Sequence, residues 1–187
     1  ATMNQWSMSL ERGLWSTAGI SLEYLGSHSY HLDRSFFNNT PSPGPGDIDA
    51  RRPNQLFRSI RTIQNDLIAN YDAMSIVFRQ QGFKGLTVLS SYTWSHTTDV
   101  STDSNGGSNV MNPYNWRLDY GDANWDVRHR FVTSLTYELP FFANASQKVV
   151  KNVLGGWQLN GISTLQSGFP FSVTISPDRA NVGQGTQ

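Results

Sequence analysis

The residues best suited to chemistry by type and spacing are Arg128 and Arg130, which lie in an alternating segment from Val127 to Leu139. Side chains alternate between the two faces of a strand, so both arginines share one face with Asp126 and Glu138. Guanidinium groups on a wet face can pair with carboxylates or guide an anionic or peptide-like solute. The spacing predicts a charged, water-facing surface and leaves these two roles open.

Metal and catalytic chemistry have weaker support. A possible calcium loop has oxygen-bearing residues at positions one, three and five and glycine at position six, but Asn rather than Glu at position twelve. In that order these residues are Ser101, Asp103, Asn105, Gly106 and Asn112. Such a stretch is typical of a flexible loop. The histidines are scattered, and three-residue spacing on a strand separates the first two: His28, His31, His96 and His129. Because the sequence also lacks a nucleophile elbow and a glycine-rich phosphate loop, we expect no enzyme activity, metal or cofactor.

Composition excludes several further classes. The 14 basic and 14 acidic residues cancel, so no basic field indicates nucleic acid as a partner. No apolar run approaches the roughly 18 residues of a membrane helix. Cysteine is absent, which excludes disulfides and thiol chemistry. The first five residues do not resemble a signal peptide, so we expect a mature form or a fragment.

Alternation of apolar and polar residues predicts an all-β chain of about six antiparallel, up-and-down strands and no confident helix. On the face opposite the arginines of Val127 to Leu139 lie Phe131, Leu135, Tyr137 and Leu139. An apolar face of about ten residues suits a tilted strand that crosses a membrane. The strands are expected near 6–10, 18–24, 72–79, 86–94, 127–139 and 157–175, with a further short strand possible at 56–63.

Connection lengths indicate the kind of sheet. Short turns follow the first and third strands, whereas long surface loops are expected at about 33–69 and 97–125. Outer-membrane barrels have such short turns at one end and long loops at the other. The connection from Phe141 to Gly155 is longer than this pattern favours. The interpretation is a partial wall of a transmembrane β-barrel.

Aromatic residues near the expected strand ends agree with this interpretation. Barrels carry aromatic girdles at the two membrane interfaces, although aromatic residues also pack the core of any sheet. The residues concerned are Tyr92, Trp94, Phe141, Phe142 and Trp157.

Three stretches resemble the β-barrel of Oar-like TonB-dependent transporters, which are outer-membrane receptors. They are Tyr24-Leu-Gly-Ser-His28 through Leu32, then Gly85 to Ser95, and a third stretch that is the most specific. This third stretch comprises Asp126-Val-Arg-His-Arg-Phe131, Tyr137-Glu-Leu-Pro140, Leu154-Gly-Gly-Trp-Gln158 and Leu165-Gln-Ser-Gly-Phe-Pro-Phe171. The resemblance covers nearly the whole chain and is thinnest at 35–69 and 101–115.

The resemblance implies a barrel of about 22 strands with a plug domain, in the outer membrane of a Gram-negative bacterium. Active uptake through this barrel would be driven by the inner-membrane TonB complex. Residues 1–187 are then expected to be an internal barrel segment without plug or terminal strands. Its expected partners are membrane lipid, its own plug, the remaining barrel strands, the TonB complex and an unknown ligand. Arg128, Arg130 and Glu138 would face the lumen.

Two other functions remain open. A soluble all-β carbohydrate-binding module would use loop aromatics to stack on sugar rings. A passive porin or adhesin barrel would lack the plug. In the transporter hypothesis the same loop aromatics help to capture ligand at the cell surface, and they are Tyr114, Trp116, Tyr120 and Trp125.

Overall fold

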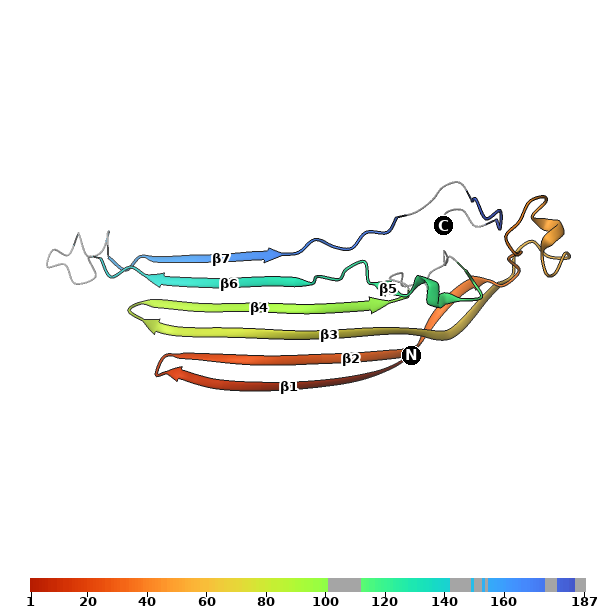
Figure 1. Ribbon diagram of the computed structural model, residues 1–187. Helices are drawn as coiled ribbons and strands as arrows, with labels where there is room; N and C mark the ends of the chain where they lie inside the picture. The colour runs from red at the N-terminus through yellow and green to blue at the C-terminus, as the bar shows by residue number, and fades with distance from the viewer. Residues whose placement is uncertain (101–111, 142–148, 150–152, 154, 174–177, 184–187) are drawn as a thin grey trace.

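A computed structural model of the chain contains one antiparallel sheet in a single layer (Figure 1). It describes residues 1–100, 112–141, 149, 153, 155–173 and 178–183. The predicted all-β, antiparallel class is confirmed, and the sheet is open rather than closed into a barrel, as expected of a partial wall. Within these ranges, no helix is long and apolar enough to span a bilayer.

Six long strands follow one another in space in their order along the chain, except that the short β5 pairs only with β4. The long strands are β1 (Thr2–Trp15), β2 (Ala18–Phe37), β3 (Arg61–Phe83), β4 (Leu86–Asp99), β6 (His129–Glu138) and β7 (Gln158–Gln166). Strand β5 is Gly121–Asp122, and two 3₁₀ turns, η1 (Asp49–Arg51) and η2 (Trp116–Asp119), lie in the loops.

Connections sort to the two ends of the sheet as predicted (Figure 1). Two-residue turns join β1 to β2 and β3 to β4 at one end, which we call the turn end. In the second turn Lys84 and Gly85 have φ values of 52° and 81°. A side chain on Gly85 would also meet the Glu138 carbonyl at 2.8 Å, so glycine is required there. The β6 to β7 connection, 139–157, is also at this end and is longer.

The opposite end, called the loop end, differs from the prediction. Strand β2 continues to Phe37 and strand β3 begins at Arg61. The loop between them therefore covers 38–60 rather than 33–69. The short strand expected at 56–63 is wrong, because only its last three residues are extended and they belong to β3. A bulge at His31, with φ 56°, shifts the register of β2 against β3. This irregularity hides the outer part of both strands from a period-two search.

The ends of the last two strands also differ from expectation. Strand β6 begins at His129, two residues later than predicted. Strand β7 ends at Gln166 instead of continuing to 175. Gly168 and Pro170 follow it, and proline lacks the N–H that a ladder needs. The apolar side chains of Phe169, Phe171 and Val173 therefore lie beyond the strand.

Few side chains are buried, because one layer has no second sheet to cover it. Most buried apolar residues in the described ranges lie toward the loop end or in its loops: Phe36, Leu67, Val100, Ala123 and Val182. The small hydrophobic core of this chain therefore stabilises the loop end and not the middle of the sheet.

Candidate functional site

Two adjacent rows of side chains cross all six long strands. In an antiparallel sheet, residues directly opposite one another lie on the same face. The apolar row is Leu10, Leu22, Ile76, Tyr92, Phe131 and Leu165. One residue away in every strand is the polar row, Ser9, Glu23, Ser75, Thr93, Arg130 and Gln166. The register therefore gives the sheet one apolar and one polar face.

The apolar face is open. Leu10 is 65% exposed, Leu22 42% and Phe131 38%. An apolar surface that extends across a whole sheet is unfavourable in water and needs an apolar cover. Lipid can supply that cover. Its hydrocarbon offers no hydrogen bonds to the backbone, but the strands inside the sheet already pair their N–H and C=O groups with neighbouring strands.

Polar and aromatic groups limit the apolar band toward the loop end. The Tyr24 hydroxyl donates to Asp72 at 2.7 Å, and the Tyr92 hydroxyl hydrogen-bonds with His129 Nδ1 at 2.8 Å. Trp94 lies opposite His129. An aromatic ring with a polar tip suits a membrane interface.

Aromatic residues also gather at the turn end. Trp15 contacts the Phe78 ring at 6.4 Å between centroids, and Phe83 and Trp157 are more than half exposed. Of the aromatics predicted to form girdles, Tyr92, Trp94, Phe141 and Trp157 lie near one limit of the band or the other, whereas Phe142 is outside the described residues. The interval between the limits, about ten residues per strand, is that of a tilted membrane-spanning strand.

The three residues predicted to line a lumen do not behave alike. Arg130 and Glu138 lie on the polar face by register, opposite Gln166 and Gln158. The Arg130 side chain is exposed and makes no hydrogen bond or ion pair with another described residue. Arg128 instead precedes β6, and its Nη2 contacts carboxylates of its own chain. That the polar face encloses a lumen stays a prediction.

Arg128 belongs to a polar cluster at the base of the loop end. Its Nη2 lies 3.2 Å from Asp126 Oδ2 and 3.3 Å from Asp122 Oδ2. Asp126 is buried and also accepts the Thr97 amide at 2.7 Å. His96 Nε2 lies 2.9 Å from Asp122 Oδ1, and this hydrogen bond, with the charges of His96 and Arg128, lowers the pKa of Asp122.

The cluster resembles a metal site that the sequence did not predict. Ligand atoms of His96, Asp122 and Asp126 lie within 4.8 Å of one another. However, the Arg128 guanidinium already supplies the positive charge between the two carboxylates. The arrangement therefore works as an ion-pair cluster that fastens the strand ends to the loop.

Arg34 is a second anchor that sequence reasoning missed, because it fell inside the predicted loop. Its guanidinium is buried and binds both carboxylate oxygens of Asp66, at 2.7 and 2.9 Å. It also donates to Gln64 at 3.1 Å and to the Pro113 carbonyl at 2.9 Å, and its Cζ lies 4.2 Å from the centre of the Phe36 ring. Arg34 therefore joins the β2 and β3 extensions to the loop that follows β4.

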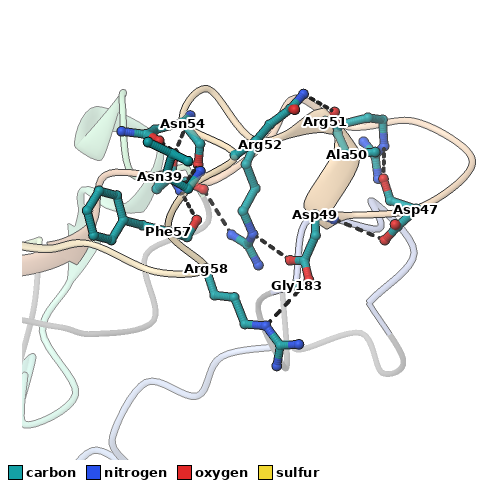
Figure 2. A network of polar contacts seen from close by, with 12 residues as sticks. Asn39, Asp47, Asp49, Ala50, Arg51, Arg52, Asn54, Phe57, Arg58 and Gly183 are labelled. Carbon is teal, nitrogen blue, oxygen red and sulfur yellow. Dashed lines mark hydrogen bonds and ion pairs between the residues drawn. The ribbon is translucent and has the colours of Figure 1, made fainter.

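Figure 2 shows how the 38–60 loop is held together. The buried Asn39 amide donates to the carbonyls of Asn54 and Phe57, at 2.8 and 2.6 Å, and accepts the Asn54 amide. Arg52 bridges the Asn39 carbonyl and the Asp49 carboxylate, at 2.9 and 2.8 Å. This network gives the loop a defined shape without regular secondary structure.

The same loop is tied to the segment 178–183 that follows β7. Arg51 Nη2 donates to the Asn181 carbonyl at 2.6 Å. The Asn181 amide in turn donates to the carbonyls of Gly44 and Gly46, both at 2.9 Å. Segments from three separate parts of the chain thus form one loop cluster at this end of the sheet.

The four loop aromatics predicted to bind ligand are not brought together. Tyr114 donates its hydroxyl to the Asn38 carbonyl at 2.6 Å, and Tyr120 bonds with Asn70 and Thr98. Trp116 carries Arg117 against its ring at 5.4 Å, and Trp125 is 53% exposed. Among the described residues, no ring contact joins any two of these four. That these side chains bind ligand stays a prediction.

The remaining candidates have structural contacts or cannot be placed. His28 hydrogen-bonds with Asn70 at 2.6 Å and stacks on Tyr30, whose ring also meets His31 edge-on. Of the possible calcium loop, only Asn112 is described, and 101–111 lie outside the described residues.

The comparisons with known proteins agree with the geometry of the sheet. The model of one family, described as "Outer membrane beta barrel domain", matches residues 1–187. Searches of curated proteins and of solved structures gave no match. Because the family match covers the whole chain, and because the sheet has one apolar and one polar face, the chain belongs to the outer membrane beta barrel domain family and is part of an outer-membrane protein.

Proposed function

We propose that this chain is part of the barrel wall of a TonB-dependent transporter in a Gram-negative bacterium. The whole protein would take up a ligand from outside the cell, with energy from the inner-membrane TonB complex. The plug domain and the other barrel strands are further partners in this proposal. The resemblance at 24–32, 85–95 and 126–171 points to this class.

The observation that best supports a transport role is the polar row. Six hydrophilic side chains lie side by side across six strands, with Glu23 near one end and Arg130 near the other. Between them the hydroxyls of Ser75 and Thr93 hydrogen-bond at 2.8 Å. Strand spacing of about 4.8 Å separates the two charges by roughly 14 Å. A wall of this kind offers a hydrophilic surface to a solute or a plug.

The energy source can be tested before the ligand is known. Periplasmic extracts of cells grown in complex medium would be compared by untargeted mass spectrometry, with and without the gene. Compounds lost with the gene are the transported compounds. We expect the same losses after deletion of TonB or after addition of the protonophore CCCP. Uptake that needs the gene but survives both treatments would show a passive porin instead.

The arginines can then be separated by their roles. Arg130→Ala should lower uptake of the identified compounds while the protein still assembles, because Arg130 has no structural partner among the described residues. Arg128→Ala should loosen the loop end, since it leaves two neighbouring carboxylates without their cation. If Arg130→Ala fails in assembly before uptake is affected, Arg130 is structural and the polar path is not supported.

The sandwich form of a soluble carbohydrate-binding module receives no support, because the described strands form one sheet with an open apolar face. A passive porin or adhesin shares the barrel architecture, and the TonB experiment separates it from the transporter.

A further inference from the structure

The loop cluster encloses a pocket of 320 Å³ between segments that are far apart in the sequence. Its walls come from 40–43, from 112–118 and from 180–182. The described residues that line it are Thr40, Pro41, Ser42, Pro43, Asn112, Pro113, Tyr114, Leu118, Ala180 and Val182. The volume is at the lower end of the range for small-molecule sites, about 300–1,000 Å³.

Hydrogen bonds hold each wall of the pocket in place. The Pro113 carbonyl accepts from the buried Arg34, and the Tyr114 hydroxyl donates to the Asn38 and Thr40 carbonyls at 2.6 and 3.1 Å. The Gly44 amide donates to the Ala180 carbonyl at 3.2 Å. Prolines in two walls further restrict the backbone. Since these walls are ordered before a ligand arrives, binding costs little conformational entropy.

Charge distinguishes this pocket from its surroundings. None of its described lining residues is ionisable except Tyr114, whose hydroxyl is already engaged. A neighbouring hollow on the same loops is instead lined by two acidic and two basic residues, Asp47, Asp49, Arg52 and Arg58. A charged ligand group would lose its hydration in the first pocket without gaining a partner. The described part of the lining therefore disfavours a charged ligand group.

We propose that this pocket binds a small neutral molecule, or the neutral end of a larger one, that carries an aromatic or branched aliphatic group. Pro41, Pro43, Leu118 and Val182 surround the apolar group. Ser42 and Asn112, which also line the pocket, can hydrogen-bond a hydroxyl or amide. This inference rests on the proposed function in one respect, because it makes the pocket the first contact for the transported ligand.

The absence of cysteine from the chain gives a direct test. Leu118→Cys would be introduced into the full-length protein, free of other cysteines, and its maleimide labelling rate measured in outer-membrane vesicles. The probes are p-cresol, which is neutral at pH 7, p-toluate, which carries the same p-tolyl group but is anionic, and methyl glucoside. Leu56→Cys, on the same cluster but outside the pocket and 88% exposed, is the matched control.

We expect saturating p-cresol to slow labelling of Leu118→Cys at least fivefold, p-toluate and methyl glucoside to have little effect, and Leu56→Cys to be unaffected. Equal protection by p-cresol and p-toluate, protection only by the glucoside, or no protection by p-cresol would overturn the proposal. Ser42→Cys, a nearly isosteric change in the opposite wall, replaces Leu118→Cys if that variant does not assemble.

The result is independent of the transport experiment. If p-cresol protects Leu118→Cys but uptake does not depend on TonB, the pocket proposal is retained and the transporter proposal is rejected. If uptake depends on TonB but p-cresol gives no protection, the transporter proposal is retained and the pocket proposal is rejected.

Discussion

Arg34 and Asp66 form a bidentate ion pair across the outer parts of β2 and β3, with N–O distances of 2.7 and 2.9 Å. The arginine is 5% exposed, whereas the aspartate is 38% exposed. The pair lies beyond the apolar band, where the strands no longer present one face to lipid. Here the ion pair, and not lipid, stabilises the arrangement of β2, β3 and the loop after β4.

Removal of the Asp66 carboxylate should release the loop after β4. Asp66→Asn leaves the buried guanidinium with a weaker partner, and we expect a local loss of about 2 kcal/mol, less than for a fully buried pair. This corresponds to about thirtyfold faster proteinase K cleavage near 112–125 on intact cells. Arg58→Met, at a 90% exposed arginine, is the control and should change cleavage less than about twofold. An equal effect of both variants would show that Arg34 is not an anchor.

Gly26 should tolerate no side chain while Trp6 is present. A Cβ there would come within 3.0 Å of three indole atoms of Trp6 on the neighbouring strand. Gly26→Ala should cost about 1–3 kcal/mol, measured as a lower urea midpoint of the folded barrel in micelles. Gly13→Ala, with no atom within 4 Å, should be much milder. If the indole causes the clash, Gly26→Ala should cost less in a Trp6→Ala background.

The two faces can be distinguished with neighbouring residues of β3. Ile76 belongs to the apolar row, and Val77 points to the polar face. Ile76→Lys should cost about 1–3 kcal/mol of barrel stability, because the lysine meets lipid within the apolar band. Val77→Lys places the same charge on the opposite face. The folded fraction in outer membranes, read from heat-modifiable gel migration, should fall mainly for Ile76→Lys, and a reversed order would exchange the two faces.

Acid should loosen the base of the loop end through Asp122. His96 and Arg128 lower the pKa of this carboxyl below its ordinary value of about 3.8. The stabilisation is therefore complete above about pH 4 and is lost as pH falls through the lower pKa of the folded state. Pepsin cleavage near β5 should rise a few fold between pH 4.5 and pH 2.5, relative to Asp122→Asn, which has no carboxylate to titrate. Identical pH profiles for both proteins would contradict the assignment.

The sequence allowed the membrane part of this fold to be predicted because each strand there meets two different surroundings. Phe131 and Arg130 are neighbours, and their difference in polarity is required by lipid on one side and a hydrophilic face on the other. Beyond the band this requirement ends. The segment from His28 to Phe37 shows no regular alternation, and the bulge at His31 shifts its pairing, so the sequence predicts a loop from residue 33 where the structure has a strand.

The loop cluster was not predictable for a different reason. Arg51 and Asn181 are 130 residues apart, and each is a residue type that is common in loops. Side-chain hydrogen bonds to carbonyls carry no periodic signature, so nothing in the local sequence specifies the partner. The sequence predicts Tyr114 as a ligand residue, but its position in a pocket wall depends on Arg34 and on the 40–43 segment, which only the folded chain brings together.

The length of β2 beyond the apolar band sets how far the loop cluster stands from the bilayer. From Tyr24, at the edge of the apolar band, the strand continues to Phe37, which is about 43 Å along the strand at the usual rise. A barrel tilt of about 40° reduces this to a height of roughly 30 Å above the lipid boundary. In the proposed orientation, with the loop end outside the cell, an antibody or a bacteriophage that approaches the cell would therefore reach the loop cluster before the bilayer.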